Sequence, residues 1–148
     1  MENHDFEILM YADEHREQLL DVWEKSVQAT HLFLKSEDFL SIKAMVKTID
    51  FHDLEVYCLV QNNTVYGFLG VAERKLEMLF LSPALFGKGH GKKLMEFAVR
   101  ELKIDKVDVN EQNSKAVGFY KKFGFKTYQR TEKDDQGNDY PLLRMKLE

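Results

Sequence analysis

Apolar and polar residues follow one another along this chain with spacings that change from segment to segment, and these changes predict an order of strands and helices. Residues 6–11 predict a short strand. Apolar side chains at helical spacing then predict a helix that is capped by Asp13 and runs to about Ala29. A second helix is expected to begin at Ser36 and to end near Ile49.

Strand patterns dominate the middle of the chain. Residues 55–61 and 65–72 predict two strands, and Asn62-Asn63 between them is typical of a tight hairpin turn. Residues 75–81 predict a third strand, because Ser82-Pro83 follows directly and ends it. We therefore expect a β-hairpin followed by a further strand.

The second half alternates between helical and strand patterns. The expected segments are, in order, a helix that ends near Lys103, a strand at 105–110, a helix from a cap at Asn113 to about Phe123, and strands at 126–132 and 140–147. Strands and helices mixed in this order predict an α/β (α+β) fold. The sequence shows no internal repeat and no obvious linker, so we expect a single domain over residues 1–148.

Composition narrows the class of protein. The chain has 148 residues, of which 44% are hydrophobic and 31% charged, and this suits one domain with a substantial core. No uncharged apolar run is long enough to span a bilayer, and the N-terminus Met1–Asp5 lacks the pattern of a secretory signal. The single cysteine, Cys58, cannot form an internal disulfide. We therefore expect a cytoplasmic protein without membrane contact.

The charge distribution argues for a small anionic ligand. The formal net charge of -4 argues against nucleic acid as the main partner, because nucleic-acid binders usually carry a basic face. A local basic patch nevertheless gathers Lys88, His90, Lys92 and Lys93 inside this acidic whole. Such a patch suits a small anion better than a long polyanion.

The centre of this patch is a glycine-rich segment between a strand and a helix. Gly87, Gly89 and Gly91 let the backbone turn sharply and direct several N–H groups into one concavity. The following helix adds unpaired N–H groups and the positive end of its dipole, and Lys88 and Lys92 add charge. The segment predicts a phosphate or pyrophosphate site, and the alternative is an ordinary glycine-rich turn between strand and helix.

Two better-known glycine motifs fit poorly. A P-loop requires a glycine where Phe86 stands, and Ser or Thr where Lys93 follows the lysine. The dinucleotide fingerprint requires a third glycine at the position of Lys92. Nucleotide hydrolysis and nicotinamide binding are therefore disfavoured.

Two segments together resemble the GNAT superfamily of acyl-CoA-dependent N-acyltransferases. The family loop Gln/Arg-x-x-Gly-x-Gly/Ala is similar to residues 86–91, which match it at Gly89 and Gly91 and depart from it at Phe86. Residues 113–125 look like the next family motif, Asn-x-x-Ala-x-x-x-Tyr-x-x-x-Gly-Phe. Further segments, at 26–31 and 135–143, are similar to a bacterial YjaB-like subgroup.

The resemblance implies a fold and a cosubstrate. The fold would be a mixed, mostly antiparallel sheet flanked by helices, with central strands that splay apart to hold acetyl-CoA. The loop would bind the pyrophosphate, and the backbone of two strand residues would pair with the pantetheine. The implied contacts with acetyl-CoA come from Leu79, Leu81, Gly87, Lys88, Gly89, His90, Gly91, Lys92 and Asn113.

The implied activity is the transfer of an acetyl group from acetyl-CoA to a primary amine, either a protein lysine or a small molecule. By resemblance, Tyr120 would protonate the departing thiolate or donate a hydrogen bond to it, and the alternative is a tyrosine that packs beside Phe119. Attack requires a neutral amine, so a base is useful. Glu77 is a candidate because it alternates with Leu79 on one strand, and the alternative is an exposed carboxylate.

Two further residues are candidates for the acceptor site. His31 follows the first helix and is expected to bind the acceptor or act as a base, or else to lie at the surface. Tyr140 is expected to border the acceptor, or else to pack against the sheet. No metal and no covalent intermediate are expected. A rival interpretation is a binding module of the same fold that senses acyl-CoA without catalysis, with Phe86 as its support.

Overall fold

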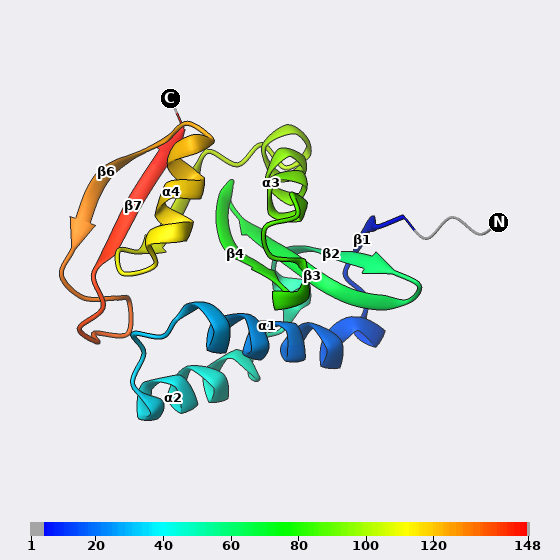
Figure 1. Ribbon diagram of the computed structural model, residues 1–148, viewed down its shortest axis with the longest axis horizontal. Helices are drawn as coiled ribbons and strands as arrows, with labels where there is room; N and C mark the ends of the chain where they lie inside the picture. The colour runs from blue at the N-terminus through cyan, green and yellow to red at the C-terminus, as the bar shows by residue number, and fades with distance from the viewer. Residues whose placement is uncertain (1–4, 148) are drawn as a thin grey trace.

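The computed structural model describes residues 5–147 (Figure 1). Residues 1–4, on which the expectation about a secretory signal depends, lie outside the described residues. The strands are β1 (Glu7–Met10), β2 (Glu55–Gln61), β3 (Thr64–Ala72), β4 (Lys75–Leu81), β5 (Lys106–Asn110), β6 (Phe125–Thr131) and β7 (Leu142–Leu147). The α-helices are α1 (Arg16–Thr30), α2 (Ser36–Val46), α3 (His90–Glu101) and α4 (Ser114–Lys122).

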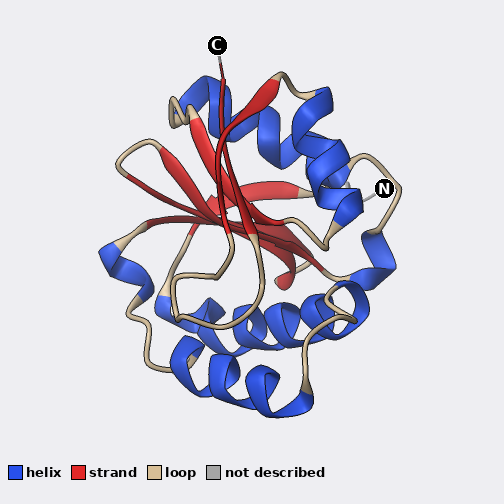
Figure 2. Cartoon of the chain, turned by 90° about the vertical axis from the view of Figure 1, so that its left-hand side faces the viewer, coloured by secondary structure: helices blue, strands red, loops and turns tan. Residues whose placement is uncertain are grey.

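The strands form one seven-stranded sheet in the order β1-β2-β3-β4-β5-β7-β6. Every neighbouring pair is antiparallel except β4 and β5, which are parallel. The helices form two layers, with α1 and α2 on one face of the sheet and α3 and α4 on the other (Figures 1 and 2). The expected mixed, mostly antiparallel sheet flanked by helices is confirmed.

Each face of the sheet has its own apolar core. Leu94 and Met95 of α3 are fully buried in the same cluster as Leu69 of β3. On the other face, Trp23 of α1 packs in a cluster with Phe68 of β3. Because successive side chains of a strand point to opposite faces, β3 supplies both cores and anchors both helix layers.

The parallel pair β4 and β5 is short. The two strands pair only at Lys75 with Lys106 and at Leu76 with Val107. β4 continues to Leu81, where it still pairs with β3 but no longer with β5. The sheet is therefore open on one side of the outer half of β4, and this opening is the splay that the resemblance implied.

Several local signals are confirmed by the backbone. Asn62 and Asn63 both have positive φ, of 51° and 63°, as the tight hairpin turn requires. The side chain of Asn113 accepts a hydrogen bond from the backbone N–H of Ala116 at 3.3 Å and so caps α4. Gly124, with φ of 104°, follows the end of that helix.

Two predicted helix boundaries are wrong. Asp13 does not cap α1, because residues 13–15 form a 3₁₀ turn and the Asp13 carboxylate lies 2.5 Å from Nε2 of His52 instead. The second helix ends at Val46 rather than near Ile49. The Arg16 guanidinium donates hydrogen bonds to the carbonyls of Lys47 and Ile49, both at 2.7 Å, and these long-range bonds satisfy the backbone where the helix stops.

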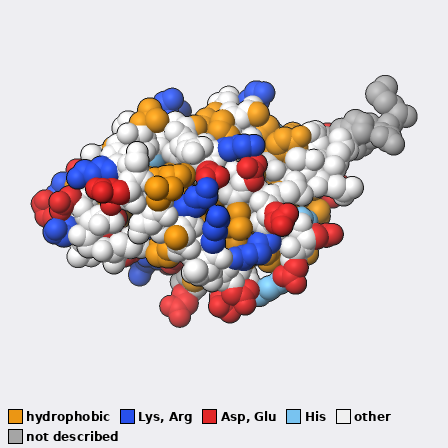
Figure 3. Space-filling model, turned by 90° about the horizontal axis from the view of Figure 1, so that it is seen from below, with side chains coloured by type: hydrophobic (Ala, Val, Ile, Leu, Met, Phe, Trp, Pro, Cys, Tyr) orange, Lys and Arg blue, Asp and Glu red, His pale blue; other side chains and the backbone are white. Residues whose placement is uncertain are grey.

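The outer surface of α1 and α2 carries acidic and basic side chains with hydrophobic ones between them (Figure 3). Within residues 5–147, none of the helices combines the length and the apolar character needed to cross a bilayer.

Candidate active site

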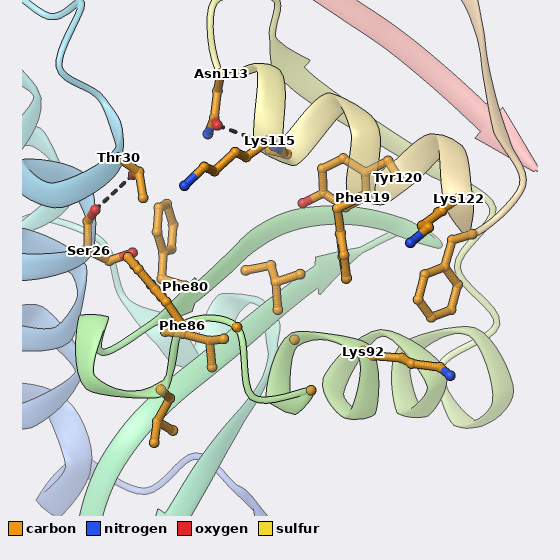
Figure 4. Close-up of a pocket in the computed structure, with 18 of the residues that line it drawn as sticks. Ser26, Thr30, Phe80, Phe86, Lys92, Asn113, Lys115, Phe119, Tyr120 and Lys122 are labelled. Atoms are coloured by element: carbon orange, nitrogen blue, oxygen red, sulfur yellow. Dashed lines mark hydrogen bonds between the residues drawn. The ribbon is translucent and has the colours of Figure 1, made fainter.

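A large cavity of about 1000 Å³ lies at the splay (Figure 4). Its walls come from the end of α1, the outer half of β4, the glycine loop, the first half of α3 and one face of α4. The volume lies at the upper end of the range for small-molecule sites. We call this space the large cavity; the sequence-predicted residues among its lining are His31, Leu79, Leu81, Gly87, Gly89, Gly91, Lys92, Asn113 and Tyr120.

The glycine loop has the backbone that an anion site requires. Gly87 and Gly89 have φ of 75° and 86°, in the left-handed region that favours glycine, and Gly89 is the residue before α3. A side-chain carbon at either position would meet no protein atom within 4 Å, so both face open space. The first N–H groups of the twelve-residue helix α3 have no partner inside the helix, and they begin directly at this loop.

The open edge of β4 offers further backbone groups. Ser82 donates its N–H to the carbonyl of Tyr66 on β3 at 2.7 Å. Because backbone groups along an antiparallel strand alternate in direction, Phe80 also faces β3, whereas Leu79 and Leu81 direct their N–H and C=O groups to the open edge. An extended ligand in the large cavity can therefore pair with Leu79 and Leu81.

Tyr120 is held inside the wall that α4 contributes. Its side chain is 8% exposed, and its ring packs on Phe119 and Phe125 with centroid distances of 5.4 and 6.0 Å. The hydroxyl points from α4 towards the space above β4 (Figure 4). Burial raises the pKa of the Tyr120 phenol above its ordinary value. The phenol therefore stays protonated at neutral pH and can act as a hydrogen-bond donor.

Lysines surround the large cavity. Lys92 of α3 and Lys115 and Lys122 of α4 line it (Figure 4). Among the described residues that line it, Glu96 supplies the single carboxylate. Two of these lysines were not predicted from the sequence. The spacing of Lys115, Phe119 and Lys122 along one helix face is the signal that identifies them, because residues three and four apart share a face.

Two of the residues predicted to contact acetyl-CoA are not among those that line the large cavity. Lys88 is exposed on the loop but is not among the residues that line the cavity. The ring of His90 lies 4.5 Å from the ring of Phe6 and does not line the cavity either.

A small cavity of about 240 Å³ lies beside the large one, on the side of α2 and the segment between β6 and β7. Four carboxylates line this small cavity, those of Glu77, Asp108, Asp134 and Asp135. Of the described residues, His31 and Phe80 line both cavities. The two spaces therefore meet at the end of α1, beside the outer half of β4.

The carboxylates of the small cavity are only partly neutralised. Asp108 is paired with Nζ of Lys75 and with the guanidinium of Arg144, both at 2.6 Å, and its side chain is 15% exposed. The same guanidinium also reaches Asp135, at 3.0 Å. Glu77 lies 3.8 Å from Lys75 and is 39% exposed. More negative than positive groups thus face this cavity.

The expectation that Glu77 and Leu79 share one face of the strand is wrong. Gly70 pairs with Met78 and Val71 pairs with Leu76, so the register shifts and Glu77 is an extra residue in a β-bulge. The bulge breaks the simple alternation along β4. Glu77 consequently lines the small cavity, while Leu79 lines the large one.

Tyr140 joins distant segments at the small cavity. Its hydroxyl donates a hydrogen bond to Oδ2 of Asp38 at 2.5 Å and accepts one from the backbone N–H of Lys35 at 3.1 Å. The side chain is 6% exposed. Tyr140 precedes β7 rather than beginning it, as the pattern had predicted, and it ties this turn to the start of α2.

The sequence resembles known acetyltransferases along almost its entire length. Residues 12–148 match the family described as the acetyltransferase (GNAT) domain. A protein of Salmonella typhimurium named peptidyl-lysine N-acetyltransferase YjaB is 40% identical over 135 residues, which cover 89% of this chain and 91% of that protein. The Escherichia coli protein of the same name is 37% identical over 133 residues, with coverage of 89% and 90%.

Solved structures agree with this assignment. The solution structure of apo YjaB from Escherichia coli superposes with a TM-score of 0.86 and 34% identity, covering 96% of this chain and 97% of that one. A PaiA N-acetyltransferase from Thermoplasma acidophilum, solved in complex with coenzyme A, shares the fold with a TM-score of 0.69, 23% identity and coverage of 96% and 99%. This chain therefore belongs to the GNAT family and is an N-acetyltransferase that uses acetyl-CoA as its acetyl donor.

Proposed function

We propose that this enzyme acetylates the ε-amino group of lysine residues in proteins or peptides. The observation that carries the proposal is that two cavities of opposite charge meet at His31 and Phe80, beside the open edge of β4. In this proposal acetyl-CoA occupies the large cavity and the acceptor lysine enters through the small one. The relatives that bear the name peptidyl-lysine N-acetyltransferase support the same acceptor class.

The residues of the large cavity fit acetyl-CoA. N–H groups at the start of α3 and the open glycine loop suit a pyrophosphate, and Lys92, Lys115 and Lys122 add positive charge to the lining of the same cavity. The free backbone groups of Leu79 and Leu81 suit the amides of the pantetheine arm. We propose that Asn113 chiefly fixes the start of α4 while its side chain borders the same space.

The chemistry requires three contributions from the protein. The lysine nitrogen attacks the thioester carbonyl, and a backbone N–H at the β4 edge near Leu79 polarises that carbonyl. Tyr120 donates its hydroxyl proton to the sulfur as the carbon–sulfur bond breaks. Because burial raises the pKa of this phenol, Tyr120 keeps its proton until negative charge develops on the sulfur.

The small cavity fits a lysine side chain. A lysine ammonium has a pKa near 10.4 and arrives with its positive charge, so the carboxylates of Glu77, Asp134 and Asp135 attract it. Trp23, Val27 and Leu34 line the same space and suit the methylene groups of the side chain.

The test is thiol release from acetyl-CoA with matched acceptor peptides. One peptide carries a single lysine and a blocked N-terminus, and its partner carries a free N-terminus with the lysine already acetylated. We expect turnover, and acetyl-lysine in the product by mass spectrometry, with the first peptide alone. Turnover of the second peptide, or of small polyamines in preference to lysine peptides, contradicts the proposed acceptor class.

A further inference from the structure

His31 is the ionisable residue at the junction of the two cavities. Of the two residues that line both cavities, Phe80 has no group that binds a proton. His31 follows the last residue of α1, and its backbone N–H donates to the carbonyl of Val27 at 2.8 Å, which holds the residue against the helix end. In the proposed function, an acetyl group in the large cavity and an amine in the small one would meet where the cavities join, at His31 and Phe80.

A chain of hydrogen bonds selects the tautomer of His31. Oγ1 of Thr30 lies 2.8 Å from the carbonyl oxygen of Ser26 and 2.7 Å from Nδ1 of His31. The carbonyl can only accept, so the Thr30 hydroxyl donates its one hydrogen to Ser26 (Figure 4). Oγ1 must then accept a hydrogen bond from Nδ1–H. The lone pair of the neutral ring therefore lies on Nε2, for which no hydrogen bond is found among the described residues.

The surroundings favour the neutral ring. Burial lowers the pKa of His31 below its ordinary value of 6.5. At neutral pH the lone pair on Nε2 is therefore available to accept a proton. The other titratable and charged groups that border the two cavities are Glu77, Glu96, Asp108, Asp134, Asp135, Lys92, Lys115, Lys122, Tyr120 and Tyr140.

We infer that Nε2 of His31 accepts the proton that the lysine nitrogen releases as it forms the amide. The inference rests on the proposed function, because it assumes a lysine amine in the small cavity. The bound lysine ammonium first loses one proton to solvent, which leaves the neutral amine. Once this amine has bonded to the carbonyl carbon, its nitrogen becomes positively charged and far more acidic than a free ammonium. The carbon–nitrogen bond forms, the carbon–sulfur bond breaks, His31 gains a proton and Tyr120 supplies one to sulfur. Solvent then restores both side chains.

Glu77 has a different role in this arrangement. Glu77 lines the small cavity but not the large one. Its side chain is 39% exposed, and its carboxylate lies 3.8 Å from the Lys75 ammonium. These features suit a carboxylate that attracts a cationic side chain at the entrance. His31 borders the acetyl-CoA cavity as well, so it is better placed to contact the reacting nitrogen.

The kinetic test compares His31→Gln with Thr30→Val and the wild type. For the wild type, kcat/KM for a lysine peptide should rise with pH because the peptide ammonium must lose a proton, and this rise should steepen into an additional acid limb with a midpoint below 6.5, where the His31 ring must also lose its proton. His31→Gln should lower kcat by about 10²-fold and abolish this acid limb, with an unchanged Kd for acetyl-CoA. Thr30→Val keeps the side-chain shape but removes the hydroxyl that accepts the hydrogen bond from Nδ1–H of His31. The ring then also populates the tautomer protonated at Nε2, so kcat should fall several-fold with an unchanged peptide KM.

The tautomer is measured separately by long-range ¹H–¹⁵N spectra of the free protein. We expect Nδ1 to carry the proton in the wild type and a larger Nε2–H population in Thr30→Val. A wild-type ring protonated mainly at Nε2, or a His31→Gln enzyme that keeps its rate and its acid limb, overturns the inference. A wild-type enzyme that acetylates no lysine peptide instead overturns the proposed function itself. The proposed role of His31 is then overturned as well, because it requires a lysine acceptor.

Discussion

The large and the small cavity are built in different ways. The large cavity takes its walls mainly from two continuous segments, the glycine loop leading into α3 and one face of α4. The small cavity collects residues from α1, α2, β4, β5 and the segment between β6 and β7. Lysines dominate the first and carboxylates the second. In the proposed function, the site of the one fixed cosubstrate is thus local in sequence, whereas the site of the variable acceptor depends on long-range packing.

This contrast predicts that substitutions on the two sides affect different kinetic constants. Changes at the loop should alter the affinity for acetyl-CoA and leave the peptide KM alone. Changes at the small cavity should alter the peptide KM and leave the affinity for acetyl-CoA unchanged. Changes where the cavities join should act on kcat, because the proposed function brings the two substrates together there.

The largest effect is expected at Tyr120. Tyr120→Phe retains the ring and its packing on Phe119 and Phe125 and removes only the hydroxyl. We expect kcat to fall by about 10²-fold with little change in the KM for acetyl-CoA, because the proton is needed as the carbon–sulfur bond breaks. Steady-state kinetics on a lysine peptide measure this. Wild-type turnover by a folded variant would reduce Tyr120 to a packing residue.

Tyr140→Phe tests whether the small cavity depends on long-range hydrogen bonds. The variant loses the bond to Asp38 and the bond from the Lys35 N–H. We expect the free energy of unfolding to fall by about 2 kcal/mol, measured by urea denaturation.

Tyr128→Phe is the matched control for that substitution. Tyr128 lies on β6 and is 47% exposed, so its hydroxyl should contribute almost nothing to stability. Equal stabilities of the Tyr140 and Tyr128 variants would contradict the structural role of the Tyr140 hydroxyl.

Gly89→Asp tests the anion site at the loop. Gly89→Asn is its control, because both side chains face the same strain at φ of 86° and only the aspartate adds a negative charge. We expect the aspartate variant to bind acetyl-CoA about tenfold more weakly than the asparagine variant, or about 1.4 kcal/mol, by calorimetry. If both bind equally, the pyrophosphate does not lie at this loop.

The smallest effect is expected at Glu77. Glu77→Gln removes one exposed charge from the small cavity and should raise the KM for a lysine peptide by about threefold at low salt, with less effect at high salt. Glu101→Gln, at the exposed end of α3, should change nothing. A raised Kd for acetyl-CoA in the Glu77 variant would contradict the assignment of the small cavity to the acceptor alone.

The sequence predicted best what depends on neighbouring residues. The hairpin turn at Asn62-Asn63, the cap at Asn113 and the left-handed glycines of the loop each follow from local backbone preferences. The order of strands and helices follows from apolar spacing, which reports directly which side chains face a core. The fold and most of the large cavity were therefore predictable.

Features that depend on pairing across the sheet or on distant contacts were not predictable. The bulge that places Glu77 arises from the register between β3 and β4, which no single strand encodes. Asp13 looked like a helix cap, but its carboxylate contacts His52, a residue far along the chain. The small cavity combines five parts of the chain, so its acidic character appears only after folding.

The proposed function places the two substrates of one reaction in the two cavities. Its most direct test is a crystal structure with a conjugate in which coenzyme A is joined through an acetyl spacer to the ε-nitrogen of a peptide lysine. We expect the coenzyme A portion to lie against residues 87–91 and the β4 edge, the lysine methylenes to lie in the small cavity, and the linking nitrogen to lie beside Nε2 of His31. A lysine portion that leaves the large cavity by another route, with the small cavity empty, would contradict it.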